Sequence, residues 1–255
     1  EAVRESRRRH GGALGQFLVV PAGQMLLSEF GYRMALLVMA GMVAIYIPLA
    51  RGLAGKPADY SAAGNVAQSL PDALREAAGS GSYWLLNGGF FVCGVHIAFI
   101  ATHFPAYLND HGLGLQIGAT ALALVGLFNI FGSYTFGVSG DRFRKKWLLS
   151  GIYGTRAIVV GLFLLAPLSS ATALIFAAAM GFLWLGTVPL TSGLVGQIFG
   201  IRHMSMLFGI VFLSHQVGSF FGAWGAGYAY RVTGSYDLAW QLSIVIAVLA
   251  AALNW

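Results

Sequence analysis

Apolar residues occur in long runs that are separated by short polar connections. A helix that crosses a bilayer needs about 20 mostly apolar residues, and eight stretches of this chain meet that requirement. They cover residues 12–28, 34–50, 83–108, 117–140, 147–168, 171–199, 204–230 and 238–255. Because most connections are short, neighbouring spans are expected to run antiparallel. The pattern predicts an all-α membrane protein with eight transmembrane helices.

One connection, residues 51–82, is much longer than the others and is polar throughout. It contains Lys56, Pro57 and Asp59 near its start. The segment 71–77 begins with proline and carries both acidic and basic residues, so we expect a short surface helix there. The rest of this stretch is expected to be a linker.

Composition supports a membrane environment. The 255 residues are 57% apolar and 9% charged, whereas a soluble domain is about one quarter charged. A soluble enzyme and a disordered chain are therefore excluded. The net charge of +6 could suggest nucleic acid, but the basic residues lie between apolar runs. The expected partner is the lipid bilayer, and no nucleic acid is expected. The single cysteine, Cys93, cannot form an intrachain disulfide.

The basic residues also predict an orientation. With the N-terminus on the cytoplasmic side, twelve of the 15 Lys and Arg residues fall in cytoplasmic segments, two fall outside and Arg156 lies within a span. Cytoplasmic loops of membrane proteins are enriched in Lys and Arg. Both termini are therefore expected to be cytoplasmic.

Residues 14–31 can be aligned with residues 217–234 at a constant offset. Gly15 then matches Gly218, and Gly31 matches Gly234. Chance similarity between two glycine-rich helices is one explanation. The other is a tandem repeat of six spans per half. Residues 1–50 would then hold the last two helices of an N-terminal half, 51–82 a cytoplasmic central loop and 83–255 the C-terminal half, with four further helices expected before residue 1.

Repeats of six spans occur in secondary transporters, and several motifs agree with that architecture. The segment 137–146 (GVSGDRFRKK), the segment 181–194 (GFLWLGTVPLTSGL) and the segment 233–237 (TGSYD) resemble the major facilitator superfamily, in particular its monocarboxylate-transporter-like and oxalate/formate-antiporter-like branch. The resemblance implies a major facilitator superfamily helical bundle of twelve helices, of which this chain holds helices five to twelve. It also implies a bacterial inner membrane location.

The first of these segments is expected to have a gating role. By resemblance, it latches the cytoplasmic side and opens when the carrier rocks. The residues concerned are Gly137, Asp141, Arg142, Arg144, Lys145 and Lys146. The alternative is that the basic residues only anchor the turn on the cytoplasmic side.

Ionisable residues inside spans are candidates for function because they are costly in a bilayer. No Asp or Glu lies in the middle of a predicted span, which favours an anion carrier without a carboxylate proton relay. His96 and His103 are seven residues apart and share a helix face. They either contact a substrate carboxylate or form interhelical hydrogen bonds. No metal site is expected, because the spacing suggests no third ligand.

Two further residues lie near the middle of their spans. Arg156 is the only basic residue within a span and could bind a carboxylate through its guanidinium. The alternatives are that it snorkels to the cytoplasmic edge or pairs near Asp141.

Asn129 is either a substrate contact or a link between helices. Animal monocarboxylate transporters tend to carry an Asp and, four residues later, an Arg here, whereas this chain has Asn129 and Ser133.

The remaining candidates are weaker. His215 and Gln216 are adjacent, so only one of them can face a given direction. Gln16 is a candidate for the cavity or for the seam between halves. Trp184 precedes Pro189, which could interrupt the helix near mid-membrane, although core packing also explains a tryptophan. In contrast, the four-residue repeat Ser214, Gly218, Gly222, Ala226 is typical of a packing seam.

Taken together, the sequence predicts a secondary transporter of small organic anions of the monocarboxylate type. It is expected to work by alternating access, with a coupled proton or counter-anion, and to use no cofactor, metal or catalytic residue. Two alternatives remain open at this stage. One is a carrier that exports drugs or amphiphiles, and the other is a truncated membrane protein without transport activity.

Overall fold

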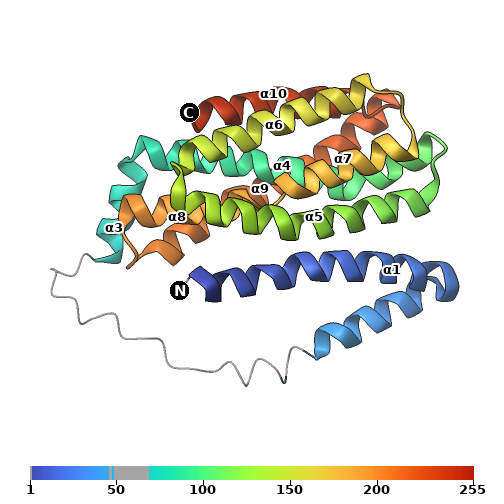
Figure 1. The fold of residues 1–255 in the computed structure, drawn as a ribbon, viewed down its shortest axis with the longest axis horizontal. Coiled ribbons are helices and arrows are strands. Elements are labelled where there is room, and N and C mark those ends of the chain that lie inside the picture. Colours follow the sequence, from blue (N-terminus) through green and yellow to red (C-terminus); the bar gives the residue numbers. More distant parts are fainter. Residues whose placement is uncertain (1, 46–47, 49–68) are drawn as a thin grey trace.

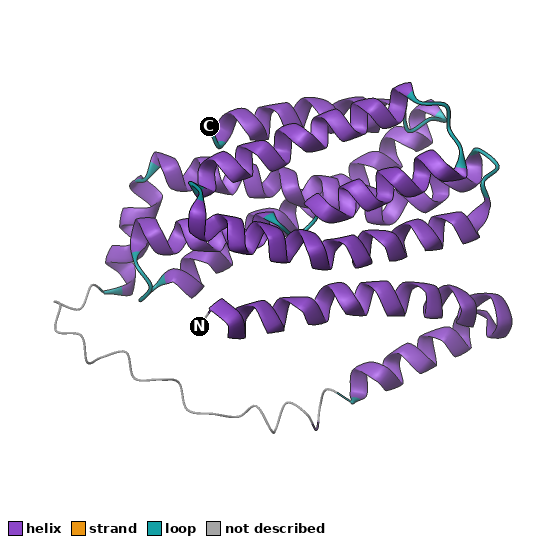
Figure 2. Ribbon diagram, viewed as in Figure 1, coloured by secondary structure: helices purple, strands orange, loops and turns teal. Residues whose placement is uncertain are grey.

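The computed structural model describes residues 2–45, 48 and 69–255, and it describes side chains from Ala22 onward apart from Gln24. All regular structure in this part of the chain is helical (Figure 2). The helices are α1 (Ala2–Ala44), α3 (Leu70–Gly79), α4 (Gly81–Asp110), α5 (Gly114–Arg142), α6 (Lys145–Leu165), α7 (Ser170–Leu183), α8 (Thr187–Phe199), α9 (Met204–Thr233) and α10 (Asp237–Leu253).

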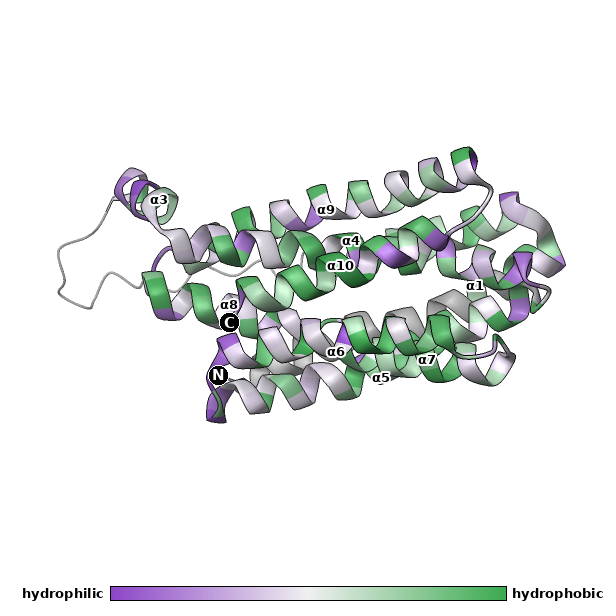
Figure 3. Ribbon diagram, turned by 90° about the horizontal axis from the view of Figure 1, so that it is seen from above, coloured by the Kyte–Doolittle hydropathy of each residue, from purple (hydrophilic) through white to green (hydrophobic). Residues whose placement is uncertain are grey.

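The long helices lie side by side in an elongated bundle (Figure 1). Six stretches are long and apolar enough to cross a membrane, namely Met25–Ala44, α4, α5, α6, Ser170–Phe199 and α9. Helix α10 is apolar but has 17 residues. Hydrophilic residues gather towards the two ends of the bundle (Figure 3). These stretches correspond to seven of the eight predicted spans, while 12–28 falls mostly on residues whose side chains are not described.

The span predicted over 171–199 is not one helix. Helix α7 ends at Leu183 and α8 begins at Thr187, so the stretch is interrupted inside the bundle. Pro189 lies in the first turn of α8, where a missing backbone N–H is tolerated. The proline therefore follows the interruption instead of sitting at it.

Helix α1 doubles back on itself at one glycine (Figure 1). Gly31 has φ 74° and ψ 171°, which agrees with the predicted gap between the first two spans. Gly234, its partner in the aligned repeat, ends α9 with φ 72°. Positive φ is readily adopted only by glycine. Both aligned segments thus end at a glycine with positive φ, but their ψ angles differ, at 171° for Gly31 and 8° for Gly234.

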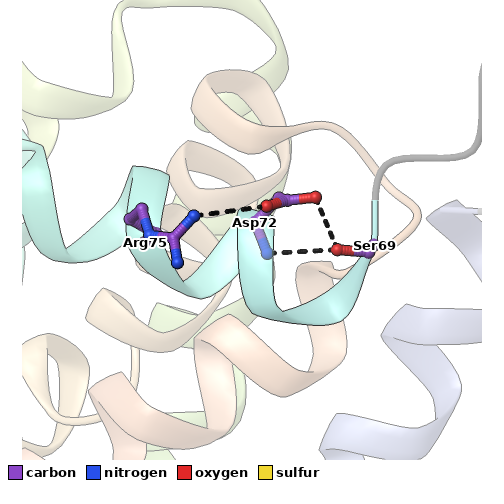
Figure 4. Close-up of polar contacts among 3 residues, drawn as sticks. All are labelled: Ser69, Asp72 and Arg75. Carbon is purple, nitrogen blue, oxygen red and sulfur yellow. Dashed lines mark hydrogen bonds and ion pairs between the residues drawn. The ribbon is translucent and has the colours of Figure 1, made fainter.

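The surface helix expected over 71–77 is confirmed as α3. Ser69 caps its N-terminus, because the Ser69 Oγ accepts a hydrogen bond from the Asp72 N–H at 3.4 Å and donates one to Asp72 Oδ2 at 2.5 Å. Arg75 lies 3.6 Å from the other carboxylate oxygen of Asp72 (Figure 4). Both ionic side chains are exposed, so this ion pair contributes little to stability.

Close helix packing occurs where glycine lets backbones approach. A Cβ atom at Gly218 or Gly222 of α9 would collide with the backbone carbonyls of Phe91 or Val95 in α4. The predicted packing seam on this helix is therefore confirmed. Helix α5 makes the same kind of contact with α7, where Gly132 faces the carbonyl of Phe182. Helix α6 packs on α10, and α1 packs on α5.

Candidate functional site

Arg156 of α6 contacts the end of α7, where the interruption between α7 and α8 begins. This side chain is 1% exposed. Its Nη2 donates hydrogen bonds to the carbonyl oxygens of Leu183 at 2.6 Å and Trp184 at 2.7 Å. These carbonyls belong to the C-terminal end of α7, where the helix dipole is negative. The guanidinium therefore satisfies acceptors that the broken helix leaves without partners.

The position of Arg156 corrects one alternative drawn from the sequence. The guanidinium lies in the interior, over the ring of Tyr153 at 5.4 Å, and it does not snorkel to the cytoplasmic edge. It forms no ion pair with Asp141, which is exposed at the end of α5. The sequence shows that an arginine lies within the span, but the direction of its side chain depends on where α7 ends.

Asn129 of α5 binds the same interruption from another side. It is 1% exposed. Its Oδ1 accepts hydrogen bonds from the Leu185 N–H at 3.1 Å and from the Ser133 hydroxyl at 3.2 Å. The structure thus places Asn129 as a link between helices. Trp184 is buried in the core beside the interruption, and its carbonyl is one of the acceptors of Arg156.

A thiol and a hydroxyl complete the polar surroundings of Arg156. The Arg156 Nη1 donates to Cys93 Sγ of α4 at 3.5 Å, and Cys93 Sγ lies 3.3 Å from Thr187 Oγ1 of α8. Both residues are fully buried. Sequence reasoning missed them as site residues, although a polar residue two positions before a mid-membrane proline was an available signal for Thr187.

His215 of α9 adjoins this group from a fourth direction. Its backbone packs against α4 at Gly94, the residue after Cys93, and its ring stacks on Phe212 at 5.4 Å between centroids. Its Nδ1 lies 3.3 Å from Gln216 Oε1. His215 is buried whereas Gln216 is exposed, so of this adjacent pair His215 is the one that faces the interior.

We refer to Cys93, Asn129, Arg156, Thr187 and His215 as the polar cluster. Its members come from five different helices and lie near the middle of the bundle's length. Throughout the part of the chain that the structure describes, no group of three or more His, Cys, Asp or Glu residues could hold a metal ion. The chemistry offered by the cluster is that of a buried cation among neutral hydrogen-bonding groups.

The two histidines of α4 do not act on one common partner. The Nε2 of His96 lies 2.8 Å from the carbonyl oxygen of Ser243 in α10. The Nε2 of His103 lies 2.8 Å from the carbonyl oxygen of Ala223 in α9, and its Nδ1 lies 3.2 Å from the Tyr236 hydroxyl. Burial, and secondly the charge of Asp110, raises the pKa of Tyr236, so this hydroxyl stays protonated and donates to His103.

The predicted gating segment forms a tight turn between α5 and α6. We refer to residues 140–146 as the basic turn. With Leu194 and Gln197 of α8, it lines a pocket of about 420 Å³. The Lys145 stem lies over Gly193, and Lys146 Nζ donates to the Trp255 carbonyl at 2.7 Å. The side chain of Gln16 lies outside the described residues, so its predicted role is not addressed here.

Comparison with known proteins agrees with this fold. The family model of the Major Facilitator Superfamily matches residues 6–223. The chain belongs to this superfamily, as the motifs predicted, and its apolar helices are those of a multi-pass membrane protein.

Its relatives include Monocarboxylate transporter 12 of Xenopus laevis, which is 26% identical over 91% of this chain and 56% of the relative. The human protein of the same name is 24% identical over 91% of this chain and 51% of its own length. The oxalate:formate antiporter of Oxalobacter formigenes is 23% identical over 67% of this chain and 41% of its own length. The resemblance to this branch is confirmed. The chain spans about half the length of these relatives.

Proposed function

We propose that this protein is a secondary transporter of small organic anions of the monocarboxylate type and that it works by alternating access. The observation that carries the proposal is the buried charge of Arg156, which forms no ion pair with any of the described residues. Its neighbours in the polar cluster are carbonyl groups, a thiol and a hydroxyl. These groups satisfy hydrogen bonds but do not neutralise a full positive charge.

A carboxylate is the natural complement of such a group. Guanidinium and carboxylate match in charge and geometry, and an unpaired charge is strongly disfavoured inside a bilayer. The Nε–H of Arg156 has no hydrogen-bond partner among the described residues, so one donor remains for a ligand. The names of the relatives, a monocarboxylate transporter and an oxalate:formate antiporter, support the same substrate class.

Alternating access would involve two helical bodies. In this proposal, 83–255 forms one six-helix body, 1–50 supplies the last two helices of the other, and 51–82 connects them on the cytoplasmic side. Helices one to four of the other body would precede residue 1. The packing of α1 on α5 supports a seam between the bodies, and the basic turn would act as the latch at the cytoplasmic end.

Orientation and location follow from the same proposal. Both chain ends and α3 lie at one end of the bundle (Figure 1), together with the basic turn. The positive-inside rule assigns this end to the cytoplasm, in a bacterial inner membrane. The residues of the polar cluster would bind and release the anion unchanged, with no covalent step.

The test is uptake of radiolabelled lactate, pyruvate, formate and oxalate into proteoliposomes. The protein is produced with whatever sequence its gene encodes on either side of these residues. We expect saturable uptake of at least one of these anions, and a loss of at least tenfold in Arg156→Gln. Arg75→Gln, on the exposed surface of α3, is the matched control and should transport normally. Unchanged uptake in a folded Arg156→Gln protein would remove the anion site from Arg156.

A further inference from the structure

Most cations of the basic turn have no charged partner in the part of the chain that the structure describes. Arg142, Arg144 and Lys145 form no ion pair there, and neither does Asp141 beside them. Lys146 is already engaged, because its Nζ donates to a backbone carbonyl at the C-terminal end. Three positive charges and one negative charge therefore remain available, and the turn has a surplus of positive charge that no described side chain neutralises.

These cations line a pocket instead of pointing separately into solvent. The pocket has a volume of about 420 Å³, and Leu194 and Gln197 of α8 also line it. Sites for small ligands commonly measure about 300–1,000 Å³. A guanidinium group can bind two oxygens of one phosphate through parallel hydrogen bonds. The charge, the size and the donors of this pocket thus suit a phosphate group.

Aromatic side chains indicate that the pocket lies at the surface of the membrane. Trp147 and Trp255 meet edge to face beside the turn, with 4.0 Å between ring centroids. Lys146 Nζ lies 4.8 Å from the centre of the Trp147 ring, and Phe143 within the turn is 64% exposed. Tryptophan is enriched where lipid headgroups meet water. The pocket is therefore at the depth at which lipid phosphates are found.

We propose that the basic turn and α8 form a binding site for the phosphate group of an anionic phospholipid. Arg142 and Arg144 would bind the phosphate oxygens, and Phe143 would contact the apolar part of the same lipid. Because the turn and α8 both line the pocket, one bound headgroup would connect α8 to the turn between α5 and α6. This site is additional to the proposed anion site at Arg156 and does not depend on which anion is transported.

A lipid is favoured over a soluble phosphate because of where the pocket lies. In the proposed orientation the basic turn is cytoplasmic, and the anionic lipids of the cytoplasmic leaflet attract Lys and Arg residues next to the membrane. Each such cation strengthens the association by about fivefold. Removal of two of them should therefore weaken lipid binding by more than tenfold.

Native mass spectrometry of the purified protein in detergent tests this site. Lipid-depleted protein is titrated with phosphatidylglycerol and, separately, with phosphatidylcholine of the same acyl chains, which has a phosphate but no net charge. We expect phosphatidylglycerol to bind saturably and at least tenfold more tightly than phosphatidylcholine. Combining Arg142→Gln with Arg144→Gln should weaken phosphatidylglycerol binding at least tenfold.

A second double variant is the matched control. Arg75→Gln combined with Arg202→Gln removes the same amount of charge from two exposed side chains outside the turn. Its affinity for phosphatidylglycerol should stay within twofold of the wild-type value. Because all four arginines are exposed, we expect both double variants to fold, and circular dichroism checks this.

Three results would overturn the lipid site. One is equal affinity for the two lipids, and another is an equal loss of affinity in the two double variants, which would show a general effect of net charge. The third is displacement of phosphatidylglycerol by inorganic phosphate at the same concentration, which would identify a soluble ligand. Lipid binding by a protein that moves none of the four tested anions would leave this site standing and overturn only the proposed function.

Discussion

Arg156 and the basic turn carry the same kind of charge in opposite surroundings. Arg156 is buried in the bundle and makes hydrogen bonds to two backbone carbonyls and a thiol. In the basic turn, Arg142, Arg144 and Lys146 are exposed, and water can solvate each of them. A buried cation needs protein groups as hydrogen-bond partners because water is excluded, whereas an exposed cation does not. Substitutions should therefore have large effects in the interior and small ones at the turn.

The largest effect is expected for Arg156→Ala. It leaves a cavity and two buried carbonyl groups without donors, each worth about 1–3 kcal/mol. We expect the free energy of unfolding to fall by about 3 kcal/mol or more, as measured by denaturant titration in detergent micelles. Arg144→Ala is the control and should stay within about 0.5 kcal/mol. Equal losses in the two variants would break the comparison.

A smaller effect is expected at two glycines of α5. A Cβ atom at Gly132 would collide with the Phe182 backbone, whereas nothing lies within 4 Å of one placed at Gly137. Overpacking of this kind costs about 1–3 kcal/mol. Gly132→Ala should therefore lower the unfolding temperature in detergent by several degrees, and Gly137→Ala should leave it unchanged or slightly raised. A drop for Gly137→Ala as large as that for Gly132→Ala would contradict this packing.

The smallest effect is expected for Lys146→Gln in the basic turn. The hydrogen bond from Lys146 to the Trp255 carbonyl is exposed, so its loss should change the free energy of unfolding by less than about 0.5 kcal/mol. Raising the salt concentration should remove even this difference. A larger, salt-independent loss would show that the turn has a structural role like that of Arg156.

The helices and their order could be predicted because hydropathy acts over whole spans. The gap near Gly31, the helix over 71–77 and the packing seam on α9 also follow from local residue chemistry. The interruption at 184–186 was predictable only in outline. Pro189 indicated a weak point, but the actual helix end depends on Arg156 and Asn129, which lie far away in sequence.

The partners of the polar side chains could not be predicted for a related reason. Spacing correctly placed His96 and His103 on one helix face, but it could not tell that His96 would meet α10 while His103 meets α9. For Cys93, the sequence predicted only that it cannot form an intrachain disulfide. Its position between Arg156 and Thr187 depends on how the three helices α4, α6 and α8 pack, which no local pattern encodes.

The interrupted helix has a consequence for how the chain is inserted during synthesis. The two carbonyl groups that receive the Arg156 hydrogen bonds lie 27 and 28 residues later in the sequence. When α6 leaves the ribosome, its arginine therefore has neither of these acceptors, and an arginine at the centre of a span raises the free energy of insertion by about 2.5–3.5 kcal/mol. We therefore expect α6 to be integrated more stably once α7 is present than before it.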